Sequence, residues 1–483
     1  MARPAVSRRK VLGAAAGSAA AVGAARLVGL GGEHAQELQR LLTGDQTSRG
    51  GWNSPLGSEQ ARVAHLLRRT TFGASAAELE RALSEGYDRT VDRLLETPAA
   101  PPPDLPGLAQ PGQPVRLNVG QLQLWWVNQM LQSSTPFAER MTFFWHGHFT
   151  SDFRKVGLQT PFIYWQNLTW REMALSDMRS MLMRVTTDPA MLRYLDLASS
   201  TGQNPNENYA RELMELFALG VGNYSEDDVR AAAKALAGWV EPRADRVADV
   251  TVDAKNGVTR KYPVYGGQAS AQFVPRRAYQ GGQVTFLGRR ASFDTLKVID
   301  QILAQPASAV FIARKVAQHF VSPRVGESYV RRLGDSFRAS RYDVKTLMRA
   351  VFSSPEFAAH ETYRGLVKAP VEMMVHALKA LNAPRLGRLV VQSGAGMGQV
   401  LFDPPDVAGW PSNEAWISSN SVVARVNFVS AALRQASALP PRSEALTHLD
   451  GVVSSQMSRL LGQAADDRVR WFLTLASPEF QLK

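Results

Sequence analysis

The 483-residue sequence contains no cysteine, which excludes disulfide bonds, thiolate nucleophiles and cysteine metal ligands. Any metal site must therefore use His, Asp or Glu, with Asn or backbone oxygen as minor ligands. The common catalytic signatures are also missing, since there is no H-E-x-x-H, no P-loop and no G-x-S-x-G elbow. The enzyme classes that those signatures define are not indicated.

Basic residues are in modest excess over acidic residues. Lys and Arg number 55 and Asp and Glu number 43, which gives a net charge of +12. Such an excess favours anionic partners, including acidic polysaccharide, phospholipid headgroups and nucleic acid. The basic residues are nevertheless dispersed in short pairs, with no long basic tail. A solvated basic surface is the alternative interpretation.

The N-terminus has the layout of an export signal. Arg8 and Arg9 follow Ser7, and an alanine-rich run extends from Val11 to Ala25. The adjacent arginines resemble a twin-arginine signal, although a basic N-terminus leading into an Ala-rich helix is an alternative. The run is shorter than the about 20 strongly apolar residues of a membrane span.

We therefore expect residues 1–35 to be a twin-arginine export signal and the protein to reach the periplasm or the extracellular space. Because the protein is expected to be exported, we expect no nucleic acid partner. We also expect no integral membrane span once the signal is removed. Residues 36–57 are polar and glycine-rich and are expected to be flexible.

Helical patterns dominate the rest of the chain. Residues 58–96 predict two helices, with Ser75 and Glu78 forming a capping box at the start of the second. The Pro-rich segment 98–114 predicts a connector without regular structure. We expect a mainly α fold, a multi-helical single large domain over residues 58–430. A C-terminal helical extension, residues 431–483, is expected to pack on the same domain.

Proline and glycine mark further boundaries. A capping residue followed by proline recurs in "STPFAER", "TTDPAMLRYLD", "SSPEFAA" and "ASPEFQL", which predicts helix starts. Alternation around Asn256-Gly257 predicts a β-hairpin from Val247 to Val264, within an insertion at about 243–290. A Gly-rich loop is expected to follow to Gly288, and helices resume at about Phe293.

The first candidate site is "FFWHGHF", which contains His146 and His148. In an extended segment both rings would face the same side and could share a metal ion, whereas on a helix they would point about 200° apart. The run from Met141 to Trp145 predicts the end of a helix at Gly147. The alternative is that both histidines bond to backbone within an aromatic cluster.

The second candidate is "NPNENYARELMELFALG", predicted to form a helix from Asn206, the cap, to Leu219, with Gly220 ending it. One polar stripe joins Asn208, Arg211, Glu212 and Glu215, with Glu207 at its edge. A stripe with carboxylates, an amide and one Arg suits cation ligation or a polar substrate. The alternative is a solvated face with i,i+4 ion pairs.

The third candidate is "LFDPPDVAGWPSNEAW". Its prolines and Gly409 preclude a helix from Asp403 to Pro411. The loop carries Trp410 and Trp416, whose indoles could stack on sugar rings or could plug the core.

These segments, together with "DPAMLRYLD", "FIARKVAQHFVSP" and "LVKAPVEMMVHAL", occur in an order that resembles the exported bacterial family called domain of unknown function 1800. The resemblance covers roughly Arg62 to Phe428. It implies a twin-arginine signal and a possible exported partner of the domain of unknown function 1501 family.

The family pattern places its aromatic-histidine run on Trp145, His146 and His148, and its Asn-Glu-Asn run on residues 206–212. It places its Gly-Trp-Pro loop on Trp410. The family tends to carry a His-Asp pair where this chain has Tyr279 and Gln280, so any function of that pair is altered here.

Two functions follow as hypotheses. The first is a metal-dependent or acid/base hydrolase-like enzyme acting on an envelope or extracellular polymer. Its catalytic groups would be His146, His148, Glu207, Arg211 and Glu212, and the metal ligands of a divalent ion would be His146, His148 and Glu212. The second is a non-catalytic envelope protein that binds an anionic polymer, a glycan or a partner. Trp410 and Trp416 would then be the contact residues. Asn206, Asn208 and Trp145 are further candidate binding residues.

Overall fold

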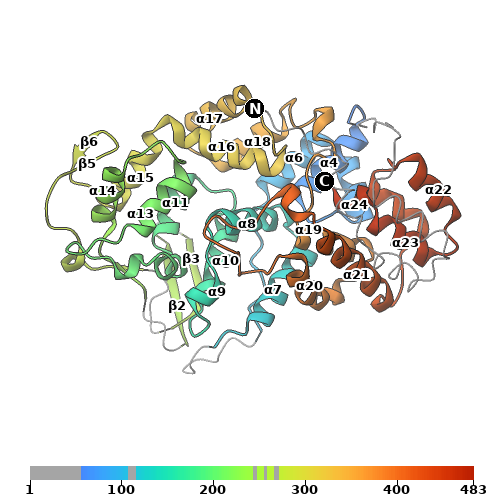
Figure 1. The fold of residues 1–483 in the computed structure, drawn as a ribbon, viewed down its shortest axis with the longest axis horizontal. Helices are drawn as coiled ribbons and strands as arrows, with labels where there is room; N and C mark the ends of the chain where they lie inside the picture. The colour runs from blue at the N-terminus through green and yellow to red at the C-terminus, as the bar shows by residue number, and fades with distance from the viewer. Residues whose placement is uncertain (1–55, 107–115, 243–246, 255–257, 266–270) are drawn as a thin grey trace.

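The computed structural model describes residues 56–106, 116–242, 247–254, 258–265 and 271–483. The expected export signal, residues 1–35, lies outside the described residues, as does all but the end of the expected flexible segment 36–57. Helices make up most of the described chain, which confirms the mainly α fold class (Figure 1).

The first part of the described chain forms a series of short helices. The elements are α4 (Glu59–Thr70), α5 (Ala76–Glu85), α6 (Tyr87–Glu96), α7 (Val119–Gln132), α8 (Pro136–His148), α9 (Phe153–Val156), α10 (Phe162–Glu172), α11 (Met178–Thr186), α12 (Pro189–Tyr194) and η2 (Leu197–Ser199). The capping box is confirmed, because Ser75 and Glu78 bond reciprocally at the start of α5. The second predicted helix is divided at Gly86, whose φ is 82°, a backbone conformation that glycine adopts without strain.

The middle of the chain carries the strands. Its elements are α13 (Asn208–Glu212), η3 (Leu213–Ala218), α14 (Glu226–Leu236), β1 (Trp239–Val240), β2 (Val247–Ala254), β3 (Val258–Tyr265), β4 (Gln272–Phe273), η4 (Pro275–Arg277), β5 (Val284–Phe286) and β6 (Arg289–Ala291). The predicted hairpin is confirmed as the antiparallel pair β2–β3, and its turn at Asn256-Gly257 lies outside the described residues. The expected loop to Gly288 is not irregular throughout, since β4 pairs with β1 and β5 pairs with β6.

Helices resume at Thr295 and continue to the end of the chain. They are α15 (Thr295–Ala304), α16 (Pro306–Phe320), α17 (Glu327–Ala339), α18 (Val344–Phe352), η5 (His360–Thr362), α19 (Pro370–Ala380), η6 (Pro384–Leu386), α20 (Gly387–Gly394), η7 (Ala395–Met397), η8 (Asn413–Trp416), α21 (Ser419–Gln435), η9 (Arg442–Leu449), α22 (Ser455–Gln463), α23 (Asp467–Ala476) and α24 (Pro478–Gln481). Residues 403–411 form no helix, as predicted.

Proline starts three of the four predicted helices. Pro136, Pro189 and Pro478 stand at the first position of α8, α12 and α24, where the missing N–H leaves no hydrogen bond unmade. The fourth prediction, in "SSPEF", is wrong because Pro355 lies in a turn that follows α18. The same four residues, Ser-Pro-Glu-Phe, occur in "ASPEF" and there begin α24. The surroundings of this motif therefore decide its structure.

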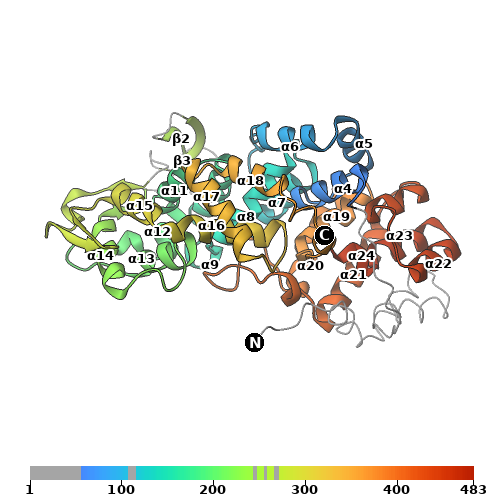
Figure 2. The same cartoon turned by 90° about the horizontal axis from the view of Figure 1, so that it is seen from above.

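One contiguous hydrophobic core joins the described helices, from Val63 in α4 to Phe480 in α24. Figures 1 and 2 both show an elongated molecule with α14 and α15 at one end, α22 and α23 at the other, and α8 and α16 between them. The C-terminal segment is tied to the centre, since the N–H of Lys483 donates to Leu366 O at 2.8 Å and the N–H of Lys368 donates to Gln481 O at 2.9 Å.

None of the described helices is by itself long and apolar enough to cross a membrane. Helices α15 and α16, which meet at an angle of 81°, have that length and composition only when taken together. Many of their apolar side chains are buried in the core.

Candidate functional site

Helix α8 positions the histidine pair. The helix continues through Gly147 to His148, so the predicted end at Gly147 is wrong. Two residues apart on an α-helix, the imidazoles project about 200° away from each other. His146 and His148 therefore lie in different surroundings and cannot readily share an ion.

His146 is fully buried in an aromatic cluster. Its ring centroid lies 4.9 Å from that of Trp126, 5.2 Å from Phe402 and 5.3 Å from Trp410. Neither ring nitrogen has a hydrogen-bond partner within the described protein. Burial lowers the pKa of His146 to about 3, so the imidazole is neutral and acts as an aromatic packing group.

His148 faces the other side of α8 and is fixed by its neighbours. Its ring stacks on Phe144 with an interplanar angle of 3°, and its Nε2 lies 2.9 Å from the carbonyl oxygen of Phe217. Because a carbonyl oxygen only accepts, Nε2 carries the proton and Nδ1 is an acceptor. Burial, with a smaller effect from the charge of Lys315, lowers the pKa of His148 to about 3.

The Trp410 loop lies directly against α8. A Cβ atom at Gly409 would approach the carbonyl oxygen of Gly147 to 2.3 Å, and the φ of Gly409 is +91°. Only glycine at position 409 permits this approach without strain. The Trp410 ring consequently stacks on Phe143, with centroids 5.9 Å apart and an interplanar angle of 12°. The first and third sequence candidates thus form one unit.

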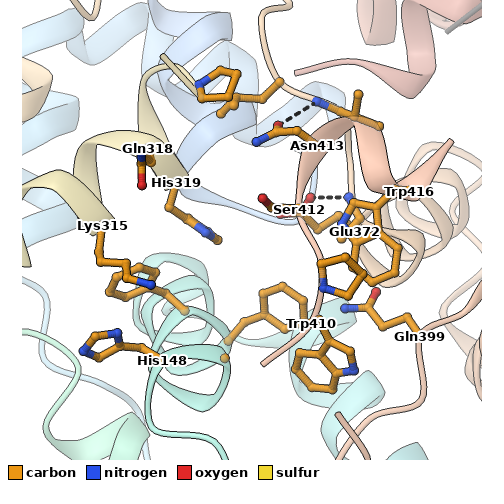
Figure 3. Close-up of a pocket in the computed structure, with 18 of the residues that line it drawn as sticks. His148, Lys315, Gln318, His319, Glu372, Gln399, Trp410, Ser412, Asn413 and Trp416 are labelled. Carbon is orange, nitrogen blue, oxygen red and sulfur yellow. Dashed lines mark hydrogen bonds between the residues drawn. The ribbon is translucent and has the colours of Figure 1, made fainter. Parts of the chain in front are cut away.

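A cavity of about 310 Å³ opens beside this unit, between α8, α16, α19 and the loop that continues into η8. Figure 3 shows His148, Lys315 and His319 along one side and Trp410, Trp416 and Gln399 along the other. The volume is at the lower end of the about 300–1,000 Å³ typical of small-molecule sites. Three of the predicted site residues, His148, Trp410 and Trp416, line it.

Glu372 is the only carboxylate among the side chains that line this cavity. Its Oε2 accepts the backbone N–H of Ala369 at 2.7 Å, which caps α19. Its Oε1 accepts Nζ of Lys483 at 2.6 Å and forms a further ion pair with Arg140. A buried carboxylate held by two cations is stabilised in its charged form by those partners.

His319 contacts the same group of charges. Its Nε2 lies 3.2 Å from Nη2 of Arg140. A guanidinium nitrogen can only donate, so Nε2 of His319 accepts and the ring proton is on Nδ1. Burial lowers the pKa of His319 well below its ordinary value, and the positive charges of Arg140, Lys483 and Arg69 lower it further.

More cations lie behind Glu372. Arg69 donates to the carbonyl oxygen of Thr362 at 2.5 Å, and Lys368 donates to that of Phe480 at 2.6 Å, so neither of these bonds is to a carboxylate. Both side chains are buried. Burial, then Arg140 and Arg69, lower the pKa of Lys483 well below its usual range. Basic side chains thus outnumber carboxylates at this end of the cavity, and burial lowers the pKa of Arg69 and Lys368 as well.

The polar stripe of the second candidate does not line the cavity. Arg211 donates to Glu226 at 2.6 Å and to Glu207 at 3.4 Å, and Asn208 donates to Asp196 at 3.2 Å. Glu212 is half-buried, and burial together with Glu215 raises its pKa. These contacts match the alternative interpretation of the stripe, a surface with ion pairs.

The helix that carries the stripe also differs from the prediction. It begins at Asn208 and continues from Leu213 as a π-helix to Ala218. Asn206 is not its cap, although its side-chain oxygen accepts the N–H of Asn208 at 2.9 Å. The predicted end is confirmed, because Gly220 has a φ of +85°. Phe217 on this helix is the carbonyl partner of His148, so the two candidates meet through buried groups and not through the stripe.

The predicted metal-ligand set is not assembled. Among the residues that the structure describes, no three His, Asp or Glu side chains are grouped so that they could hold a metal ion. His146, His148 and Glu212 are all described, so the structure corrects this predicted set.

Two further predictions concern residues away from the cavity. Trp145 is fully buried, and its indole N–H donates to Ala174 O at 2.9 Å, so it is part of the core and not a binding residue. Gln280 donates to Pro275 O at 3.0 Å, and the ring of Tyr279 lies 5.4 Å from Nζ of Lys234. Neither Tyr279 nor Gln280 lines the cavity.

Sequence reasoning missed Lys315, His319, Glu372 and Lys483. One signal was available for the first two, since residues four apart on a helix share a face and "FIARKVAQHF" places Lys315 and His319 in that relation. Glu372 looks like a capping residue in sequence, which it also is. Nothing local in the sequence brings Lys483 to Glu372.

The fold and the cavity define a class of protein: a large, mainly α-helical chain whose central helices and one tryptophan-bearing loop border a cavity lined by aromatic and basic side chains. Residues 65–482 match the family described as "Protein of unknown function (DUF1800)", and the chain belongs to that family. The match extends past Phe428 and so includes most of the segment that the sequence suggested was an extension. No curated protein and no solved structure matches the chain.

Proposed function

We propose that this protein binds a sugar unit of an envelope or extracellular polymer in the cavity beside Trp410. The observation that carries the proposal is the placing of Trp410 and Trp416 at one cavity of about 310 Å³ together with side-chain amides. Indole rings offer broad apolar faces to the C–H groups of a sugar, and amides pair with its hydroxyl groups.

The shape of the tryptophan wall supports a binding role. One face of Trp410 is covered by Phe143, so the ring is held in a fixed orientation before a ligand arrives. Trp416, the last residue of η8, is almost fully buried. A preorganised aromatic wall loses little conformational entropy on binding.

A hydrolase-like activity has less support. Of the groups expected to carry it, only His148 lines the cavity beside Trp410, and His146 and the Glu207–Glu212 stripe do not. We therefore prefer the binding function to the enzymatic one.

The place of action follows from the sequence. We propose that the twin-arginine signal exports the protein to the periplasm or beyond, where such polymers occur. The exported family called domain of unknown function 1501 is the proposed protein partner, on the resemblance alone.

Isothermal titration of the full chain with a panel of neutral and acidic oligosaccharides tests the proposal. Trp410→Ala is expected to weaken binding at least about tenfold, because aromatic side chains at the centre of a site contribute most of its affinity. Trp239→Ala is the matched control, since Trp239 donates to Thr295 and lies outside the cavity. A panel with no ligand bound, or an equal loss in both variants, would contradict the proposal.

A further inference from the structure

Several side chains that line the cavity have hydrogen-bond donors that the described part of the protein itself does not use. Gln399 is 1 % exposed, and its Oε1 accepts the backbone N–H of Val371 at 2.9 Å. Its Nε2 has no partner within the described chain. Asn413 is used in the same way, because its Oδ1 accepts the N–H of Val367 at 3.4 Å. The half-buried Asn413 therefore leaves its amide NH₂ group available to a ligand, whereas the unpartnered Nε2 of Gln399 is enclosed by protein.

The indole and the imidazole beside these amides add further donors. The buried Nε1 of Trp410 also lacks a partner within the described residues. His319 accepts from Arg140 at Nε2, which leaves Nδ1–H as its donor. Together these donors are complementary to a ligand that carries hydrogen-bond acceptors.

The charged side chains of the cavity also favour an acceptor-bearing ligand, because basic groups outnumber carboxylates. Lys315 pairs with no carboxylate in the part of the chain that the structure describes, and its amine lies 5.5 Å from the centroid of the Phe311 ring. Glu372 is already bonded to Arg140 and Lys483. The single negative charge of the lining is thus shared by two cations, and Lys315 remains uncompensated.

Lys315 and His319 occupy one face of α16, four residues apart, and Figure 3 shows both side chains directed toward the cavity. They lie across the cavity from Trp410 and Trp416. A sugar ring on the indoles would place a ring substituent near the amine and the imidazole N–H. Charge-assisted hydrogen bonds from such donors to an anion are stronger than those to a neutral hydroxyl group.

From this arrangement we infer that the cavity selects an acidic sugar unit, whose carboxylate or sulfate ester binds between Lys315 and His319 while its ring lies against Trp410. The inference rests on the proposed glycan binding and names its substrate class. Glu372 keeps Arg140 and Lys483 in place beneath the ligand. The selectivity belongs to the enclosed cavity and not to the dispersed positive charge of the surface.

Matched pairs of ligands separate the charge from the sugar backbone. The full chain is titrated with oligogalacturonate and with its methyl ester, which has the same backbone without the charge. A sulfated agar-type oligosaccharide and its unsulfated counterpart form the second pair and distinguish sulfate from carboxylate. At least one charged ligand is expected to bind roughly tenfold more tightly than its neutral counterpart.

Lys315→Met is expected to abolish that roughly tenfold preference, so that the charged and the neutral ligand of a pair bind about equally. Lys297→Met on the neighbouring helix α15 is the control, because it removes the same charge from an exposed side chain outside the cavity. Thermal unfolding of both variants checks that they are folded.

The possible failures are distinguishable. Equal binding of charged and neutral ligands would overturn the acidic-sugar inference and leave the proposed glycan binding in place. A preference that Lys297→Met reduces as much as Lys315→Met would assign it to surface charge and also overturn the inference. Absence of binding to every oligosaccharide would overturn the proposed function itself.

Discussion

His146 shows how a single residue can look like a ligand in sequence and serve as packing in the fold. Two histidines with a single residue between them suggest a shared metal ion. On the helix, however, their rings point in different directions, and the aromatic cluster encloses His146. A neutral imidazole is tolerated there because it behaves as a small aromatic ring. Its protonated form would place an unpaired charge in the core.

This burial makes the stability of the fold depend on pH. The pKa of His146 is about 3 in the folded protein and about 6.5 in an unfolded chain. Below about pH 6.5 the unfolded state therefore binds a proton that the folded state does not, and the free energy of unfolding falls as the pH falls toward 3. One such group contributes a slope of about 1.4 kcal/mol per pH unit.

Urea unfolding between pH 7 and pH 4 measures this effect. His146→Phe keeps an aromatic ring without the titrating group, so its free energy of unfolding is expected to depend less steeply on pH, by about one proton. Both proteins are measured at the same series of pH values, so the difference between their slopes isolates the group at position 146. Equal slopes for His146→Phe and wild type would show that His146 does not titrate as described.

At the scale of elements, sequence signals predicted helix starts correctly where neighbouring residues alone make the required contacts. The capping box at Ser75 and the proline starts of α8, α12 and α24 need only neighbouring residues, and the structure contains them all. The same logic was wrong at Pro355, where the chain turns instead of starting a helix. The π-helix after Glu212 was likewise not predicted, since the sequence pattern indicated one continuous α-helix to Leu219.

The contact between α8 and the Trp410 loop gives a prediction at this scale. Gly409→Ala would place a Cβ atom 2.3 Å from Gly147 O at a φ of +91°, so the loop must shift away from α8. A loss of about 2 kcal/mol in the free energy of unfolding is expected, together with weaker oligosaccharide binding. Chemical denaturation and titration measure the two effects.

Gly396→Ala is the matched control for that loop. Nothing lies within 4 Å of a Cβ atom at position 396, so the substitution should change neither stability nor binding by a comparable amount. If Gly409→Ala behaved like Gly396→Ala, the close approach of the loop and α8 would have no energetic role.

At the scale of the whole molecule, the chain closes on itself around the cavity. Lys483 reaches Glu372 across 111 positions of sequence, and Arg68 pairs with Asp450. The described segment from Ser455 to Lys483 thus belongs to the core and to the site. The hydrophobic core continues from the preceding helices into this segment.

A substitution of Phe480 tests whether the C-terminal segment stabilises the fold and the cavity. Its side chain is fully buried, with its ring centroid 4.0 Å from Nζ of Lys368 and 4.5 Å from the ring centroid of His376. Phe480→Ala is expected to lower the free energy of unfolding by about 3–5 kcal/mol. It should also weaken ligand binding, because Lys483 follows closely in the same segment. Unchanged binding in a clearly destabilised variant would separate the segment from the site.

The sequence by itself determined the helical class, the hairpin, most helix starts and the glycine and tryptophan positions of the loop. These features depend on residues close together in the chain, whose periodicity and capping are local properties. Only the tertiary structure decided which polar groups share a cavity. The pairing of Glu372 with Arg140 and Lys483, and the facing of Lys315 toward Trp410, join distant segments, and no local pattern encodes how separate helices pack.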